Sequence, residues 1–302
     1  MESNIINIID KDAKQACQTA NPKYHFVKAL RPFSLPVALI TCSLGIAAGL
    51  QAQTVNPLSA LLVLLAGLFL QAGVNLINDY ADLKNPVSRQ RLNPIDINRV
   101  TLNYRLGWIC FVICAFTGLY LSYQTSLFLL VLAMIGGLGA LCYTTEPIHY
   151  KRRGLGVILV FFLMGVLMVY GACYAVTGQH YVQAIFVSIP VSFFTSALLL
   201  ANEIRDYNSD QKEGLKTLTV RWGLNRGKKL YAILIACGFA SMTTLIASKQ
   251  LWVACLIFIP AIFIAIRAIH TSTTNTNLKN LPPITGRLYL VFGASEIIFL
   301  MI

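Results

Sequence analysis

Apolar residues occur in long runs along most of the chain, and short polar stretches separate these runs. A transmembrane helix needs roughly 20 consecutive apolar residues to cross the hydrocarbon core of a bilayer. Runs approaching that length occupy residues 29–50, 57–79, 104–122, 125–143, 154–176, 182–203, 229–247, 251–269 and 286–302. The pattern therefore predicts an all-α, polytopic membrane protein with about nine transmembrane helices.

Composition supports this prediction. Of 302 residues, 56% are hydrophobic and 12% are charged, whereas about 25% of the residues of a typical soluble domain are charged. Residues 1–28 form a polar N-terminal segment without the apolar core and small-residue cleavage site of a signal peptide. We therefore expect residues 29–302 to form one transmembrane domain.

The positions of the basic residues predict the orientation. If the N-terminus is cytoplasmic, every Lys and Arg except Lys249 falls in a cytoplasmic loop or at a cytoplasmic span end, as the positive-inside rule requires. Topology thus accounts for the net charge of +12, and we expect no nucleic-acid partner because no soluble basic face is present. The eight cysteines are scattered without a CxxC pair, so we expect neither disulfides nor zinc.

Acidic residues are rare, and half of the 12 lie in two short segments at predicted cytoplasmic span ends. The segments read NLINDYAD from Asn75 to Asp82 and NEIRDYNSDQKE from Asn202 to Glu213. At 3.6 residues per turn, each segment places one amide and two carboxylates on a single helix face. These faces consist of Asn75, Asp79 and Asp82, and of Asn202, Asp206 and Asp210.

These two faces predict a metal site. Carboxylates close to a bilayer normally face the protein interior, pair with cations or bind a metal. Oxygen ligands suit Mg²⁺, which keeps coordination positions for water and for phosphate oxygens of a substrate. One Asp-x-x-x-Asp at a span end is ordinarily an interfacial acid, but two matching faces on the same side favour Mg²⁺ ions that bridge to a diphosphate.

At these segments the sequence resembles the UbiA superfamily of membrane prenyltransferases, whose members carry two Asp-rich motifs at the ends of the second and sixth helices. More narrowly, it is similar to the dihydroxynaphthoate polyprenyltransferases of menaquinone synthesis. The matching segments are Arg31-Pro32 with Leu35-Pro36, the stretch from Asn75 to Asp82, Tyr143-Thr144 with Pro147 and Arg153-Gly154-Leu155-Gly156, and NEIRDYNSDQKEGLKTLTVRWG from Asn202 to Gly223. The resemblance spans roughly residues 29–300.

The resemblance implies a fold, a reaction and roles for particular residues. It implies a helical bundle around a central cavity that opens to the cytoplasm and to lipid. It also implies Mg²⁺-dependent transfer of a polyprenyl group from its diphosphate to 1,4-dihydroxy-2-naphthoate, with Asp79, Asp206 and Tyr143 as catalytic residues. The implied metal ligands are Asn75, Asp79, Asp82, Asn202, Asp206 and Asp210, and the implied diphosphate-binding residues are Lys151, Arg153, Arg91, Lys216 and Arg221.

Each of these roles has a simpler alternative. The basic residues also fit the positive-inside rule, and Tyr is common at membrane interfaces, although the face of the Tyr143 ring would stabilise a carbocation. The chain also departs from the subfamily: Lys84 to Ser88 reads KNPVS where a Gly and an Asp are expected, and Val157 replaces a Glu. An acceptor such as 4-hydroxybenzoate, homogentisate or another phenol therefore stays open.

Two other classes of protein compete with this prediction. A cation-coupled transporter would place ionisable groups near the bilayer midplane, whereas the acids here cluster at span ends. A scaffold without catalytic activity would not need two complete acidic faces. We expect membrane lipids and the two substrates as partners, no obligate protein partner, and a bacterial inner membrane with the N-terminus and the active-site loops in the cytoplasm. The sequence does not predict the prenyl length or the oligomeric state.

Overall fold

The computed structural model describes residues 20–90, 92–143, 145, 147–274 and 278–302. Within these residues every regular element is a helix. The predicted boundary at residue 28 falls inside the short helix α2 (Phe26–Ala29), and it stays a prediction because most of the N-terminal segment lies outside the described residues.

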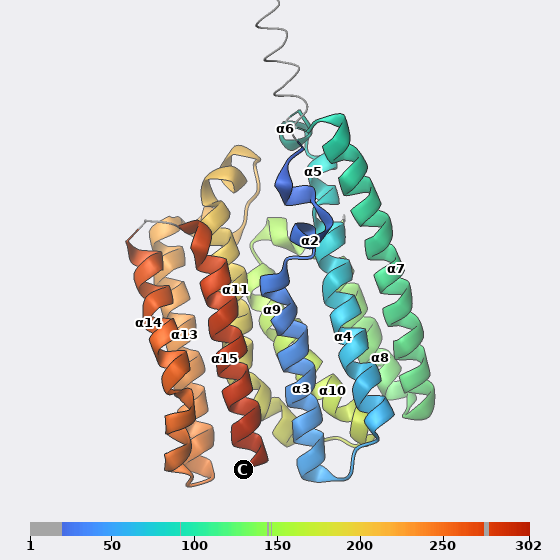
Figure 1. The fold of residues 1–302 in the computed structure, drawn as a ribbon, viewed down its shortest axis with the longest axis vertical. Coiled ribbons are helices and arrows are strands. Elements are labelled where there is room, and N and C mark those ends of the chain that lie inside the picture. Colours follow the sequence, from blue (N-terminus) through green and yellow to red (C-terminus); the bar gives the residue numbers. More distant parts are fainter. Residues whose placement is uncertain (1–19, 91, 144, 146, 275–277) are drawn as a thin grey trace, which may run out of the picture.

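Long helices run side by side between two ends of the molecule (Figure 1). They are α3 (Leu35–Ala52), α4 (Pro57–Asn78), α7 (Pro94–Gln124), α8 (Leu127–Leu141), α9 (Gly156–Val160) continued by the π-helical η4 (Phe161–Val166) and α10 (Leu167–Thr177), α11 (Val182–Lys212), α13 (Leu224–Ser248), the 3-10 helix η5 (Trp252–Phe258) continued by α14 (Ile259–Thr273), and α15 (Leu281–Met301). This order confirms the predicted all-α membrane bundle.

Eight of the described helical segments are long and apolar enough to cross a bilayer. The remaining predicted span, at residues 125–143, contains the apolar helix α8 of 15 residues. At 1.5 Å per residue, α8 is only about 22 Å long. The sequence therefore predicts the position of this helix correctly, but the polar turns at both ends of the apolar run shorten it.

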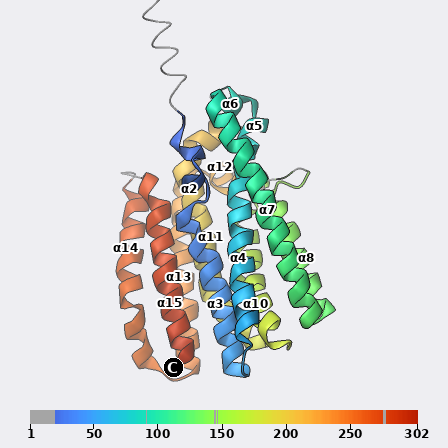
Figure 2. The same cartoon turned by 45° about the vertical axis from the view of Figure 1, so that its right-hand side comes forward.

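Short helices join the long ones at the end of the molecule that carries both acidic segments, which we call the acidic end. They are η1 (Pro22–Tyr24), α2, η2 (Pro32–Ser34), α5 (Tyr80–Lys84), α6 (Pro86–Arg89), η3 (Tyr150–Arg153), α12 (Leu218–Trp222) and η6 (Leu278–Asn280). In Figure 2 the helices α2, α5, α6 and α12 lie toward this end, beside the upper parts of α7 and α11. The C-terminus lies at the opposite end, which we call the far end.

Two long helices extend past the predicted spans at the acidic end. Helix α7 begins at Pro94, ten residues before the apolar run, because the side chain of Asn93 caps the backbone N–H of Asp96 and proline suits a first turn. Helix α11 continues through the second acidic segment to Lys212. The face of the second motif therefore stands on helical backbone.

The best-packed part of the molecule lies between α3, α11, α13 and α15. Phe194, Tyr231 and Phe292 are fully buried there, and the rings of Phe194 and Phe292 lie 4.1 Å apart between centroids. Gly293 lets α15 approach α3, since a Cβ at this position would lie only 2.2 Å from Ile40 Cγ2. These helices form a rigid wall for the second motif.

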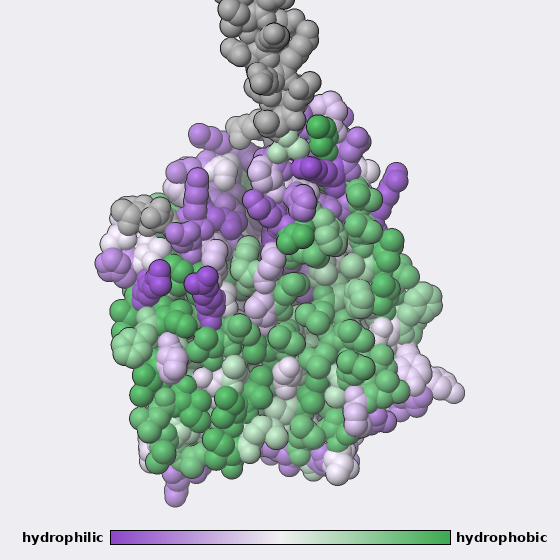
Figure 3. Space-filling model, viewed as in Figure 1, coloured by the Kyte–Doolittle hydropathy of each residue, from purple (hydrophilic) through white to green (hydrophobic). Residues whose placement is uncertain are grey.

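The sides of the bundle are apolar. Phe116, Leu127 and Phe263 are 69%, 76% and 69% exposed. Soluble proteins rarely expose large contiguous apolar patches of this kind to water. Figure 3 shows hydrophobic residues over most of the visible side and hydrophilic residues gathered at the acidic end. The protein is therefore an integral, multi-pass membrane protein.

A cavity of about 820 Å³ lies inside the other half of the bundle, between α4, α7, α8, η4, α10 and α11. Its wall is almost entirely apolar. The polar exceptions are Arg31, Ser34, Gln71, Asn75, Tyr143, Tyr150, Thr195 and Asn202. Most of these come from segments close to the acidic motifs, so the cavity has a polar end and a long apolar remainder.

Candidate active site

The first motif ends helix α4. Asn75 lies in the last turn of α4, and Asp79 is the residue between α4 and α5. Asp79 is only 2% exposed. Asp82 lies in α5, but its side chain is outside the described residues. The sequence-predicted face is thus helical up to Asp79, where the backbone turns from α4 into α5.

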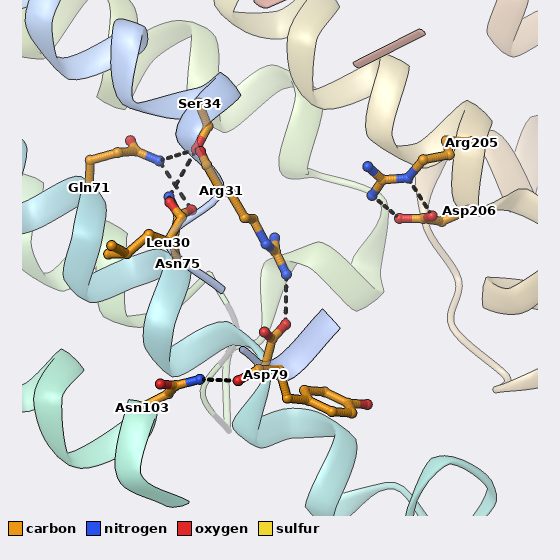
Figure 4. Close-up of polar contacts among 10 residues, drawn as sticks. Leu30, Arg31, Ser34, Gln71, Asn75, Asp79, Asn103, Arg205 and Asp206 are labelled. Carbon is orange, nitrogen blue, oxygen red and sulfur yellow. Dashed lines mark hydrogen bonds and ion pairs between the residues drawn. The ribbon is translucent and has the colours of Figure 1, made fainter. Parts of the chain in front are cut away.

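Arg31 neutralises the first motif. Its Nη2 donates to Asp79 Oδ1 at 2.8 Å (Figure 4). Asn78, oriented with its amide oxygen toward the guanidinium, accepts from Nη1 at 2.9 Å. Arg31 has φ 51° and ψ 68°, a left-handed conformation that is rare for residues other than glycine and asparagine. Strain of this kind persists where surrounding contacts demand it, often at functional sites.

Asn75 joins the first motif to the N-terminal part of the bundle. Its Nδ2 donates to the carbonyl of Leu30 at 2.7 Å and to Ser34 Oγ at 2.9 Å, and its Oδ1 accepts from Gln71 Nε2 at 3.3 Å (Figure 4). These bonds hold the segment around Arg31 against α4. Sequence reasoning assigned Asn75 to metal binding alone and missed this structural task.

The second motif lies on α11, where Asn202, Asp206 and Asp210 follow one another at intervals of about one helical turn. Arg205 Nε and Nη2 donate to the two carboxylate oxygens of Asp206 at 2.7 and 2.6 Å, a bidentate pair. Asn202 donates from Nδ2 to the carbonyl of Leu198 at 3.0 Å and lines the cavity. In Figure 4 the Arg205–Asp206 pair lies on the opposite side of the view from the Arg31–Asp79 pair.

Glu203 and Asp210 fasten the segment after α11. Glu203 is 3% exposed, and its Oε2 accepts from the backbone N–H of Thr219 at 3.0 Å and from the Thr219 hydroxyl at 3.2 Å. Asp210 Oδ2 accepts from Thr217 Oγ1 at 3.4 Å. These bonds dock α12 against α11. Sequence analysis gave Glu203 no role, although an acid inside an otherwise apolar helix was a signal for one.

Two of the predicted basic residues lie on the docked segment. Arg221 donates from Nε to the carbonyl of Lys216 at 2.9 Å, and both residues are exposed. Gly154 packs on them, since a Cβ there would lie 2.8 Å from Arg221 Cδ. The loop after α8 and the segment before α13 therefore form one surface at the acidic end.

The loop after α8 brings Lys151 closest to the acids. Lys151 is half-buried and interacts electrostatically with Glu203, Asp206 and Asp210. Arg153 is exposed and donates from Nη2 to the carbonyl of Pro147 at 2.9 Å. The structure therefore brings Lys151 to the second motif and leaves Arg153 at the rim. Arg91 lies outside the described residues.

Tyr143 stands between the two motifs, at the polar end of the cavity. Its ring meets Tyr150 edge to face, with centroids 5.3 Å apart. Burial raises the pKa of the Tyr143 phenol well above its ordinary value, and the negative charge of Glu203 raises it further. The nearby Arg31 opposes this shift without cancelling it. Tyr143 is therefore a neutral phenol at physiological pH.

The two motifs share an electrostatic environment. The charge of Arg31 acts on Asp79 and also on Asp206, which belongs to the other motif. Among the described side chains, no three His, Cys, Asp or Glu residues come together in one metal-binding cluster. The carboxylates are instead held by arginines, one for each motif.

The oxygen atoms of the site nonetheless fit a hard divalent cation. Asp79 Oδ2 is buried and has no hydrogen-bond partner among the described residues, while Oδ1 is held by Arg31. An unpartnered buried carboxylate oxygen is unfavourable unless a cation or a proton satisfies it. Amide and carboxylate oxygens are also the ligands that Mg²⁺ prefers.

The chain is similar in sequence to known proteins. The chain is 27% identical over 290 residues to UbiA prenyltransferase domain-containing protein 1 of Gallus gallus, covering 92% of this chain and 84% of that protein. It is 33% identical over 220 residues to a 1,4-dihydroxy-2-naphthoate octaprenyltransferase of Haemophilus influenzae, covering 68% and 71% of the two chains.

Solved structures have the same fold. A UbiA homologue from Archaeoglobus fulgidus, bound to DMAPP and Mg²⁺, superimposes with a TM-score of 0.61 at 17% sequence identity, covering 90% of this chain and 98% of the homologue. The family described as the UbiA prenyltransferase family matches residues 38–282, which include both acidic motifs and nearly the whole cavity wall. The predicted resemblance is confirmed, and this chain belongs to the UbiA prenyltransferase family as a membrane-embedded prenyltransferase.

Proposed function

We propose that the protein transfers a polyprenyl group from polyprenyl diphosphate to an aromatic quinone precursor, with 1,4-dihydroxy-2-naphthoate as the first acceptor to test. One observation carries the proposal: a long apolar cavity ends between two acidic helix ends, each already paired with an arginine. This arrangement matches a substrate with an apolar tail and a highly charged head. The relative from Haemophilus influenzae is named for this acceptor.

The diphosphate head would be held at the acidic end. Asp79, Asn202, Asp206 and Asp210 supply oxygens for Mg²⁺, and Asn75 Oδ1 keeps a lone pair beside its bond from Gln71. When bound, Mg²⁺ neutralises the charge that develops on the departing pyrophosphate. Magnesium in the Archaeoglobus fulgidus homologue supports this part of the proposal.

The basic residues assist the leaving group. Arg31 and Arg205 each hold one motif carboxylate through guanidinium N–H groups, and the same groups are suited to bidentate bonds with phosphate oxygens. Lys151 adds positive charge on the side of the second motif. Donors placed where negative charge develops lower the barrier to bond cleavage.

Tyr143 protects the allylic cation that remains. The phenol is neutral because its pKa is raised, so its ring face offers electron density without becoming a competing nucleophilic phenolate. Tyr150 fixes the ring orientation from its edge. The apolar wall behind Tyr143 excludes water from the cation, which favours attack by the acceptor ring over hydrolysis.

The identity of the acceptor substrate has an alternative. The Gallus gallus relative matches more of the chain than the naphthoate enzyme does, and its name specifies no acceptor. The segment from Lys84 to Ser88 also departs from the naphthoate pattern, and it joins the end of α5 to α6 through the N-cap residue Asn85. Another phenol, such as 4-hydroxybenzoate or homogentisate, is therefore the alternative acceptor.

We also propose that the acidic end faces the cytoplasm of a bacterial cell, in the inner membrane. The support is the distribution of charge: the basic residues of η3 and α12 lie at the acidic end, whereas Lys249 follows α13 at the far end. A cysteine introduced at Lys249 should react with a membrane-impermeant thiol reagent added outside intact cells, and one at Lys216 should not.

The test of the reaction uses membranes that contain the full chain. They receive Mg²⁺, a radiolabelled polyprenyl diphosphate and a panel of acceptors that includes dihydroxynaphthoate and hydroxybenzoate. We expect lipid-extractable product that requires Mg²⁺ and disappears in the Asp79→Asn, Asp206→Asn double variant. Glu213→Gln, which removes an acid outside both motif faces, is the matched control and should keep its activity. Folded protein that prenylates no acceptor would refute the proposal.

A further inference from the structure

We propose, resting on the proposed function, that four glycines on three helices form the wall of a channel for the prenyl tail and set the tail length that the protein prefers. They are Gly118 on α7, Gly136 and Gly137 on α8, and Gly171 on α10, and we call them the glycine wall. The preferred donor then carries a tail of about four isoprene units or more.

The glycine wall has no packing reason for its missing side chains. A Cβ built at Gly137 or Gly171 would meet no atom within 4 Å, and one at Gly118 would meet only Ala133 Cβ at 3.9 Å. Gly67 shows the opposite case in the same cavity, because its Cβ would lie 2.5 Å from Cys42 Sγ. Gly67 is needed for helix packing, whereas the glycine wall leaves space.

All four glycines line the cavity. On α7 the lining residues Phe111, Ala115 and Gly118 recur every three or four positions, the spacing of one helix face. Leu167 and Gly171 repeat the pattern on α10. The glycines therefore stand on three different helices that line one cavity.

Glycine is also a poor choice for these positions on other grounds. It weakens a helix interior relative to alanine because it gains conformational freedom in the unfolded chain. Four such positions around one cavity, without close neighbours, give up helix stability and gain only volume. A cavity wall that must lie close to a bulky, flexible, apolar ligand has a use for that volume.

A polar group at one end of the cavity points independently to a ligand. Gln71 lines the cavity, is 5% exposed, and its Oε1 has no hydrogen-bond partner among the described residues. Together with the unpartnered Asp79 Oδ2, it marks the acidic end as the place of a polar head. The glycine wall then faces the part of the ligand that follows this head.

The depth of the cavity gives the tail length. Asn75 and Val63 both line it and lie twelve residues apart on α4, which corresponds to about 18 Å along the helix axis. One isoprene unit adds four carbons to the chain, about 5 Å at ordinary single-bond lengths. At the far end the lining residues are Leu121, Leu129 and Ala175. About four units therefore fit, and further units must lie outside.

The experiment measures donor binding to the detergent-solubilised full chain with Mg²⁺ and without acceptor, by isothermal titration calorimetry. The ligands are inorganic pyrophosphate, geranyl diphosphate with two isoprene units, and geranylgeranyl diphosphate with four. The variants are Gly137→Leu and Gly171→Leu. The control is Val131→Leu, which adds apolar volume to α8 outside the cavity lining, at a side chain that is 40% exposed.

We expect the wild-type protein to bind the four-unit donor at least about tenfold more tightly than the two-unit donor, because more apolar carbon is buried. Each Leu variant should lose most of that preference and bind pyrophosphate and the two-unit donor as before. Equal weakening of both donors, or an unchanged preference in both variants, would overturn the proposal. A wild-type protein without tail-dependent binding would overturn it as well.

Alanine variants test the proposal with smaller substitutions, in case the leucine variants misfold. Gly137→Ala and Gly171→Ala add one methyl group each and should not lower the unfolding temperature, yet should weaken the four-unit donor by about threefold. Transfer assays separate the two proposals: tail-dependent binding without transfer to any acceptor refutes the proposed reaction alone. Transfer with a preference for the longer donor that survives both Leu substitutions refutes the glycine wall alone.

Discussion

The two acidic motifs look alike in sequence but are held in different ways. Asp79 is 2% exposed and pairs with Arg31, which lies 48 residues away in a segment with a strained backbone. Asp206 is 41% exposed at its side chain and pairs with its own neighbour, Arg205. The first carboxylate is therefore part of the tertiary structure, whereas the second is held locally and is free to change partners when a ligand arrives.

The largest expected effect is at Asp79. Asp79→Ala should lower the free energy of unfolding by about 2–3 kcal/mol, because it removes a buried carboxylate that holds the partly buried Arg31 side chain, which is 27% exposed. Asp206→Ala should change it by less than about 1 kcal/mol, because that pair is partly exposed. Both variants should lose transfer activity. Thermal unfolding in detergent, measured beside the transfer assay, would contradict the comparison if both variants were equally stable.

Variants of Glu203 test whether this acid, and not Asp206, stabilises the tertiary structure around the second motif. Glu203→Ala leaves the buried N–H of Thr219 without an acceptor and should lower the free energy of unfolding by about 2 kcal/mol. Glu203→Gln keeps an acceptor oxygen and should stay close to wild type. Proteolysis between α11 and α12 would report the loosened segment, and equal protection of the Ala variant and the wild type would rule out this role.

Arg31→Lys sharpens the comparison, because it keeps the positive charge at the first motif but removes the planar guanidinium group. A lysine has no planar fork to reach Asp79 and Asn78 together, so stability should fall by about 1 kcal/mol. Transfer should fall further, by about tenfold to a hundredfold, because leaving-group contacts depend on geometry. The matched variant Arg205→Lys should reduce activity without a change in unfolding temperature. Comparable losses of stability in the two variants would remove the distinction.

The smallest effect concerns Tyr143, which stands between the motifs. Because its folded-state pKa is raised, its contribution to stability is fully present below about pH 10, the ordinary value for tyrosine, and is lost as pH rises toward the folded-state value. Tyr143→Phe should keep transfer within about fivefold of wild type, since the ring face remains. It should also reduce the loss of stability above about pH 10. A loss of stability as steep as in the wild type would show that Tyr143 is not the group responsible.

Much of the fold was predictable because the bilayer imposes a simple rule on composition. Runs such as 57–79 and 182–203 had to be helices, since a backbone in hydrocarbon must satisfy its own hydrogen bonds. The ends of α7 and α11 were not predictable from apolarity, because they leave the hydrocarbon and depend on caps and on local helix propensity. Polar continuations of a helix carry no apolar signal.

The site was predictable in its residue types but not in its pairing. Asp79 and Asp206 were found from their spacing, and the structure places both at the acidic end of one bundle. The Arg31–Asp79 pair joins segments 48 residues apart, and such a contact depends on how α3 packs against α4. A left-handed arginine before a proline also gives no signal in composition. The partners that Asn75, Glu203 and the two aspartates bind could therefore be identified only from the structure.

The short helix α8 has a consequence for the membrane itself. A helix of about 22 Å stands in a hydrocarbon layer of about 30 Å, so the mismatch beside it is about 8 Å. Lipids can relieve such a mismatch by local thinning, so we expect a thinner bilayer next to α8, which lines one side of the cavity. Membrane thickness then becomes a variable of the enzyme's environment, and the protein should concentrate in the thinner regions of a mixed bilayer.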